Sequence, residues 1–119
     1  MGFRKLLAYE KGFDLAMNIF ELSKLFPKEK TYSLTDQIRR SFRFVCANIS
    51  EAYRKRKYPK HFISKLSDAN SENAETLVWL EFAEACNYIT QEKKVELENK
   101  NIETGKLLSF MMNNPDKFM

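Results

Sequence analysis

Glycine and proline are scarce in this 119-residue chain, which has three of each. Pro27, Pro59 and Pro115 fall between periodic segments or near the tail, so long stretches lack a strong helix breaker. Long uninterrupted helices explain this scarcity better than a sheet, which would need many turns. The composition therefore predicts an all-α protein, and the length suits a single domain with its own core.

Cysteine and long apolar runs are also in short supply. No run of eighteen apolar residues could span a membrane, and residues 1–11 lack the apolar core and cleavage site of a secretory signal. Cys46 and Cys86 form no CxxC pair and sit within helical patterns, as is typical of buried free thiols in a reducing cytoplasm. We therefore expect a cytoplasmic protein with no membrane contact.

The chain has one histidine, which limits the chemistry that it could perform. A di-iron site in a helical bundle needs a Glu-x-x-His pair on each of two helices, whereas His61 follows Tyr58 at that spacing. Two separated cysteines and one histidine do not make a zinc site, and His61 has no evident orienting acid for a nucleophile. We expect neither enzymatic activity nor a cofactor.

The rest of the chain is organised around the stretch from Leu34 to His61. Ser33 and Asp36 stand at capping-box spacing, and Pro59 marks the far boundary because the residue before a proline leaves the helical region. The spacing therefore predicts a helix over residues 34–56, with Pro59 opening the next one. Its apolar residues recur at steps of three and four and line one face: Leu34, Ile38, Phe42, Val45, Ile49 and Ala52.

The same periodicity predicts three further helices, over residues 8–26, 59–87 and 91–114. Thr90 is expected to cap the last of them, with an inward face of Val95, Ile102, Leu108 and Met112. Four long helices with short links fit an antiparallel up-down bundle that forms one domain over residues 1–119.

Two of these helices carry more apolar surface than one core can bury. The first has one stripe of Tyr9, Phe13, Ala16 and Phe20, and a second stripe of Leu15, Ile19, Leu22 and Phe26. The third is apolar almost all round after Leu77, and such a segment is buried on every side. We therefore expect a homo-oligomer. The expected interface residues are Leu15, Ile19, Leu22, Trp79 and Phe82.

The formal net charge of +4 hides an uneven distribution. Residues 37–61 carry eight Lys or Arg against one acid, whereas residues 66–104 carry nine acids against three lysines. The cations near Tyr53 and Tyr58 suit phosphate contacts with bases stacked on the rings, although a solvated basic helix end would look the same. The candidate nucleic-acid-binding residues are Arg43, Arg54, Lys55, Arg56, Lys57 and Lys60.

Polar residues beside the apolar stripe of the second helix form another group. The amide of Asn48 needs a partner inside the bundle, and Glu75 on the third helix could bind Asn48 or Arg40. We predict a structural polar network that fixes the register of the helices. Its members are Arg39, Arg40, Asn48, Glu51 and Glu75.

Several of these residues together resemble a known family of four-helix bundles, encoded within intervening sequences of bacterial 23S ribosomal RNA genes. The matching residues are Phe26–Pro27, LxxQxRRS at 34–41, NIxE at 48–51, and Phe62, Leu66, Ala69, Ser71 and Glu75. The chain departs from the family at Cys46, Ala52 and Asn70, where the family commonly has proline, glycine and glycine. The first two changes favour a straighter second helix.

The resemblance implies an antiparallel bundle that assembles as a homopentamer. It also implies kinship with the accessory protein of diversity-generating retroelements, a basic pentameric barrel that engages a reverse transcriptase and nucleic acid. Together with the basic run, it favours a non-enzymatic scaffold that binds RNA or DNA. The alternative is a protein-binding adaptor that recruits a nucleic-acid-processing protein without touching nucleic acid itself.

Overall fold

The computed structural model describes residues 2–27 and 34–119. This part of the chain contains no strand, and the prediction of an all-α protein with four helices is confirmed. The α-helices are α1 (Leu7–Ser23), α2 (Asp36–Arg54), α3 (Pro59–Ala85) and α4 (Gln91–Asn113), with short 3₁₀ helices η1 (Phe3–Lys5) and η4 (Pro115–Phe118) at the two ends.

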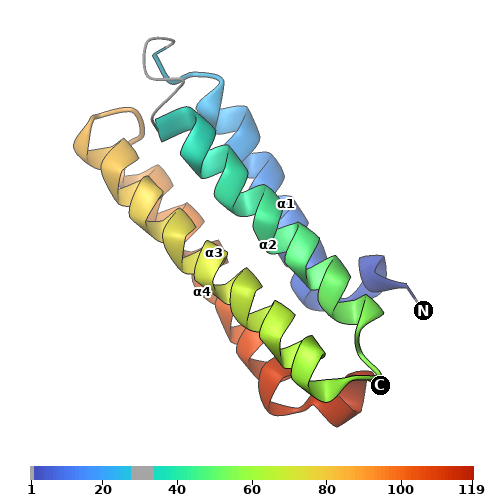
Figure 1. Ribbon diagram of the computed structural model, residues 1–119. Coiled ribbons are helices and arrows are strands. Elements are labelled where there is room, and N and C mark those ends of the chain that lie inside the picture. The colour runs from blue at the N-terminus through green and yellow to red at the C-terminus, as the bar shows by residue number, and fades with distance from the viewer. Residues whose placement is uncertain (1, 28–33) are drawn as a thin grey trace.

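The four helices lie alongside one another in a bundle that measures 44 × 25 × 21 Å (Figure 1). Helix α2 packs mainly on α3, α3 also packs on α4, and α1 contacts both α2 and α4. Both termini and the α2–α3 connection lie at the same end of the bundle, and the α3–α4 connection lies at the other (Figure 1). Residues far apart in the sequence therefore meet at one end.

Local sequence signals set the helix ends. Pro59 is the first residue of α3, and the Thr90 hydroxyl accepts a hydrogen bond of 3.1 Å from the Lys93 amide, so both predicted helix starts are confirmed. Asn87, two residues beyond the end of α3, has φ 61°, a left-handed conformation that asparagine tolerates better than most residues. The predicted cap at Ser33 lies outside the described residues.

The core forms along the predicted apolar face of α2. Its members Ile38, Phe42, Val45, Ile49 and Ala52 are all fully buried. The other helices supply fully buried side chains opposite them, among them Leu15, Ile19, Phe62, Leu66, Leu80, Leu97 and Leu108. Helix α2 is continuous from Asp36 to Arg54, as the departures at Cys46 and Ala52 suggest.

Helix α1 buries in the core the apolar stripe that was predicted to face a second subunit, and it leaves the other stripe more exposed. Leu15 and Ile19 are only 0% and 1% exposed, so they belong to the core and have no surface to offer a second subunit. Leu22 is half-buried, whereas Phe13 on the other stripe is 49% exposed. The interface assignment of Leu15 and Ile19 is therefore corrected, because two apolar stripes on one helix look alike in sequence.

Helix α4 also turns a different face inward. Val95 and Ile102 are exposed, so their predicted place in the core is wrong. The inward face is instead Leu97, Asn101, Thr104, Leu108 and Met111, in which two of the five side chains are polar. A search for apolar residues misses such a face.

Those polar side chains form a hydrogen-bonded layer inside the bundle. Asn73 donates to the Asn101 carbonyl at 3.0 Å, and Asn101 donates back to the Asn73 carbonyl at 2.9 Å and to its side-chain oxygen at 3.1 Å. A Cβ atom on Gly105 would lie only 3.2 Å from the Asn73 amide nitrogen, so glycine makes room for the pair. The hydroxyls of Ser41 and Thr76, 2.8 Å apart, join α2 to α3 in the same way.

We predict that Asn101→Ala lowers the free energy of unfolding by about 2 kcal/mol, because it removes the amide that donates to the carbonyl and the side-chain oxygen of buried Asn73. Urea denaturation followed by circular dichroism measures the change. Asn99→Ala is the matched control, since Asn99 is an exposed asparagine on the same helix. Equal stability of the two variants would contradict a structural role for the pair.

Candidate nucleic-acid interface

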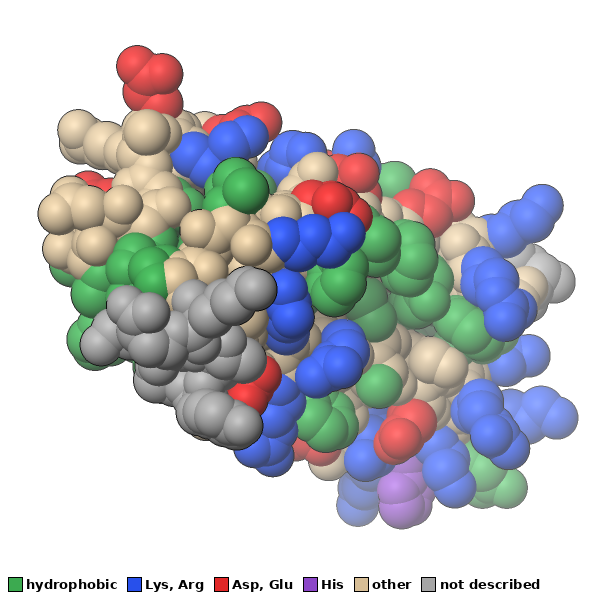
Figure 2. Space-filling model, turned by 90° about the horizontal axis from the view of Figure 1, so that it is seen from above, with side chains coloured by type: hydrophobic (Ala, Val, Ile, Leu, Met, Phe, Trp, Pro, Cys, Tyr) green, Lys and Arg blue, Asp and Glu red, His purple; other side chains and the backbone are tan. Residues whose placement is uncertain are grey.

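Cations from both ends of the chain, the end of α2, the α2–α3 connection and the start of α3 gather at one end of the bundle. We call this surface the basic end, and it consists of Arg4, Lys5, Arg54, Lys55, Arg56, Lys57, Lys60 and Lys117. Contacts of η1 with α2 and of η4 with α3 hold the two terminal segments there. Figure 2 shows Lys and Arg side chains around the lone histidine on this part of the surface. Such a cluster of positive charge suits contact with phosphates.

Four of the predicted nucleic-acid-binding residues, Arg54, Lys55, Lys57 and Lys60, are exposed at the basic end. Arg56 is half-buried. Its guanidinium donates to the Tyr53 carbonyl at 2.9 Å and lies 4.1 Å from the centroid of the Tyr53 ring. Arg56 thus satisfies a carbonyl in the last turn of α2. This contact agrees with the alternative in which the cations stabilise the end of the helix instead of binding phosphates.

Exposed aromatic surface lies beside these cations. The Tyr58 side chain is 60% exposed, and its ring meets the His61 ring edge to face with centroids 6.1 Å apart. Glu51, the one acid of residues 37–61, forms an ion pair of 3.0 Å with Lys65. The hydrogen bond and the charge of Glu51 raise the pKa of Lys65. Glu51 is therefore balanced by a cation outside the basic end.

Sequence reasoning missed Arg4, Lys5 and Lys117 as members of this surface. No local motif marks them. The signal that could have found them is topological, because the predicted up-down bundle would place the start of its first helix and the end of its fourth beside the link between the second and third.

The five residues of the predicted polar network do not form one network. Arg39 donates to the Ser23 hydroxyl at 2.6 Å, and the Arg40 guanidinium lies 5.4 Å from the centroid of the Phe44 ring. Glu51 pairs with Lys65, Glu75 accepts from the Trp79 indole at 3.1 Å, and Asn48 is half-buried. The prediction is corrected, because the buried pairs that join the helices are Asn73–Asn101 and Ser41–Thr76.

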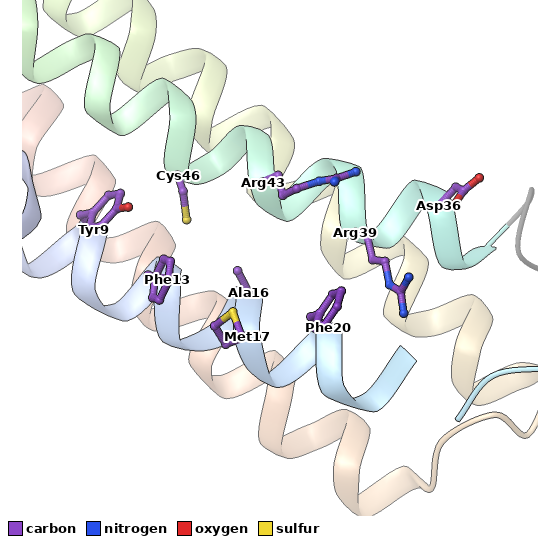
Figure 3. Close-up of a pocket in the computed structure, with 9 residues that line it drawn as sticks. All are labelled: Tyr9, Phe13, Ala16, Met17, Phe20, Asp36, Arg39, Arg43 and Cys46. Carbon is purple, nitrogen blue, oxygen red and sulfur yellow. The ribbon is translucent and has the colours of Figure 1, made fainter. Parts of the chain in front are cut away.

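Arg43 stands apart from the rest of the predicted interface. It lies eleven residues before Arg54 on α2, which corresponds to about 16 Å along the helix axis. It lines a groove of about 390 Å³ between α1 and α2 (Figure 3). The groove is lined by Tyr9, Phe13, Ala16, Met17, Phe20, Asp36, Arg39, Arg43 and Cys46.

The two cysteines differ in environment. Cys46 is half-buried in the groove, and burial raises the pKa of its thiol to about 11. Cys86 is exposed at the end of α3, so the expectation that both thiols are buried is corrected for Cys86. Glu72, on α3, has its pKa raised by partial burial and by the neighbouring Glu75.

Within residues 2–27 and 34–119, no three His, Cys, Asp or Glu side chains are grouped so that they could hold a metal ion. No helix in the same residues is both long enough and apolar enough to cross a membrane.

The fold and this surface define the class of the protein, a four-helix protein with cations collected at one end. The chain belongs to the family of 23S rRNA-intervening sequence proteins, whose model matches residues 4–110. The resemblance in the sequence is therefore confirmed. No curated protein matches the chain.

A solved structure supports the same relationship. The chain resembles the crystal structure of a protein of unknown function from the S23 ribosomal protein family of Bacteroides thetaiotaomicron VPI-5482. The two are 32% identical with a TM-score of 0.82, and the match covers 90% of this chain and 96% of the other.

We predict that Cys46 reacts slowly with a thiol reagent such as DTNB at pH 7, because its raised pKa leaves little thiolate. In the Cys86→Ser variant, where only Cys46 remains, the rate should rise about tenfold per pH unit between pH 7 and 9. The Cys46→Ser variant, in which only the exposed Cys86 can react, is the control. Rapid labelling of Cys46 at pH 7 would contradict the burial of its thiol and the raised pKa.

Proposed function

We propose that this chain is a non-enzymatic, homo-oligomeric bundle that binds RNA or DNA through its basic end. The observation that carries the proposal is the convergence of cations from η1, α2, the α2–α3 connection, α3 and η4 on one surface. A surface of this kind attracts phosphates by releasing counterions, so its affinity depends steeply on salt and little on sequence. Tyr58 adds an exposed ring on which a base could stack.

The proposal includes an antiparallel up-down bundle and assembly into a homopentamer, as the family resemblance implies. Surplus apolar surface on α3 supports self-association. Phe82 is 54% exposed, Val78 is also exposed, and the half-buried Trp79 ring lies 5.9 Å from the Phe82 ring between centroids. Adjacent exposed apolar side chains of this size are typical of a surface that a partner covers.

Self-association would strengthen a weak phosphate site. A ring of subunits repeats the basic end once per subunit, so that a single nucleic-acid strand can touch several copies. Binding to the second copy is then effectively intramolecular, and avidity exceeds the affinity of one site by orders of magnitude.

A second candidate function is a protein-binding adaptor that recruits a nucleic-acid-processing protein. The exposed apolar residues Val78 and Phe82 favour it, because they could dock a different protein as well as a second copy. Retention of one protein partner after nuclease treatment would favour the adaptor. Loss of all partners after the same treatment would favour direct nucleic-acid binding.

We predict that replacing Arg54, Lys55, Lys57 and Lys60 together with alanine abolishes most of the salt-dependent binding. The slope of log affinity against log salt should fall by about 3 for single-stranded RNA, since each lost phosphate contact removes about 0.7. Fluorescence anisotropy with a labelled RNA over a series of salt concentrations measures the slope.

The control removes the same number of positive charges elsewhere, by changing Lys11, Lys93, Lys94 and Lys106 to alanine. That variant should keep most of the slope, because its lysines lie outside the basic end. If the two variants bind alike, general charge rather than the basic end accounts for binding, and the proposal fails.

A further inference from the structure

The groove between α1 and α2 has an aromatic side that is open to solvent. Helix α1 contributes Tyr9, Phe13, Met17 and Phe20 to it (Figure 3). The rings of Tyr9 and Phe13 are stacked, with centroids 6.0 Å apart and planes 23° from parallel. Phe13, Met17 and Phe20 are all exposed. Exposed, stacked rings form a platform that a planar group can extend.

The other side of the groove is cationic. Helix α2 contributes Arg39 and Arg43, against Asp36 as the one acid among the lining residues. Arg39 is held in place, because its Nε donates to Ser23 and its guanidinium lies 4.7 Å from the centroid of the Phe20 ring. Figure 3 shows Arg43 extended along α2 beside the groove. The ligand that suits both sides is a planar apolar group attached to an anion.

Side-chain contacts link the groove to the basic end. The Tyr9 ring meets the Phe3 ring of η1 edge to face, with centroids 5.0 Å apart. The Arg4 guanidinium of the basic end lies 4.7 Å from the centroid of that Phe3 ring. Aromatic and cationic side chains therefore follow one another from η1 into the groove.

We propose that a single-stranded segment of nucleic acid runs from the basic end into this groove, with bases stacked on the α1 rings and phosphates against Arg39 and Arg43. The inference rests on the proposed function, and it adds that the bound nucleic acid is single-stranded. A duplex keeps its bases stacked on one another, so their faces are not free to meet the rings. The groove extends over twelve residues of α1, from Tyr9 to Phe20, or about 16 Å along the axis, which accommodates about five stacked nucleotides at 3.4 Å each.

The test compares single-stranded RNA with a duplex of the same length, by fluorescence anisotropy on the full chain. Phe13→Ala and Arg43→Ala should each weaken binding of the single strand about tenfold and leave duplex binding unchanged. Ile102→Ala is the control, because Ile102 on α4 is as exposed as Phe13, 49% in each case, and lies outside the groove. It should change neither affinity.

A cross-linking measurement on the unaltered protein gives an independent readout. RNA that carries 5-iodouridine should cross-link on irradiation to Tyr9, Phe13 or Phe20, as mapped by mass spectrometry. Cross-links confined to Tyr58 at the basic end would overturn the groove assignment and leave the proposed function intact.

Other outcomes also separate the two proposals. If the groove variants bind the single strand normally while the basic-end variant does not, the groove assignment fails alone. If Phe13→Ala lowers the molar mass in light scattering, a second copy of the chain occupies the groove, and the inference is overturned. If the unaltered protein binds no RNA at low salt, both proposals fail.

Discussion

Two asparagines buried between α3 and α4 constrain how the bundle is put together. Asn73 and Asn101 satisfy one another only when the two helices stand in one register, and buried amides that lack partners are costly. Gly105 leaves the space that this close approach requires. With the Ser41–Thr76 pair, which joins α2 to α3, the polar layer fixes the relative positions of three helices.

That register determines what lies at each end of the bundle. It brings the end of α4, with Lys117 just beyond it, level with the start of α3 at Lys60. The Phe118 ring packs beside the Phe62 ring, with centroids 6.1 Å apart, and so holds η4 against α3. Lys117 therefore joins the basic end through packing inside the bundle rather than through a local motif.

The sequence predicted the helices and the core of α2 because steps of three and four residues reveal a buried stripe directly. It could not tell which of two apolar stripes on α1 faces inward, so Leu15 and Ile19 were assigned to a subunit interface. It misread α4 because Asn101 and Thr104 are buried through hydrogen bonds, which leave no trace in apolar periodicity. The run of cations at residues 54–60 can be recognised in the sequence, whereas Arg4, Lys5 and Lys117 come close to it only when the chain folds.

Light scattering of the pure protein, alone and with a short single-stranded RNA at low and moderate salt, shows whether the protein is an oligomer that binds RNA. We expect a stable oligomer that takes up RNA at low salt and releases it as the salt concentration rises. A monomer would contradict the inference of self-association from the exposed apolar surface of α3. An oligomer whose mass is indifferent to RNA would contradict the role of the basic end and favour the adaptor.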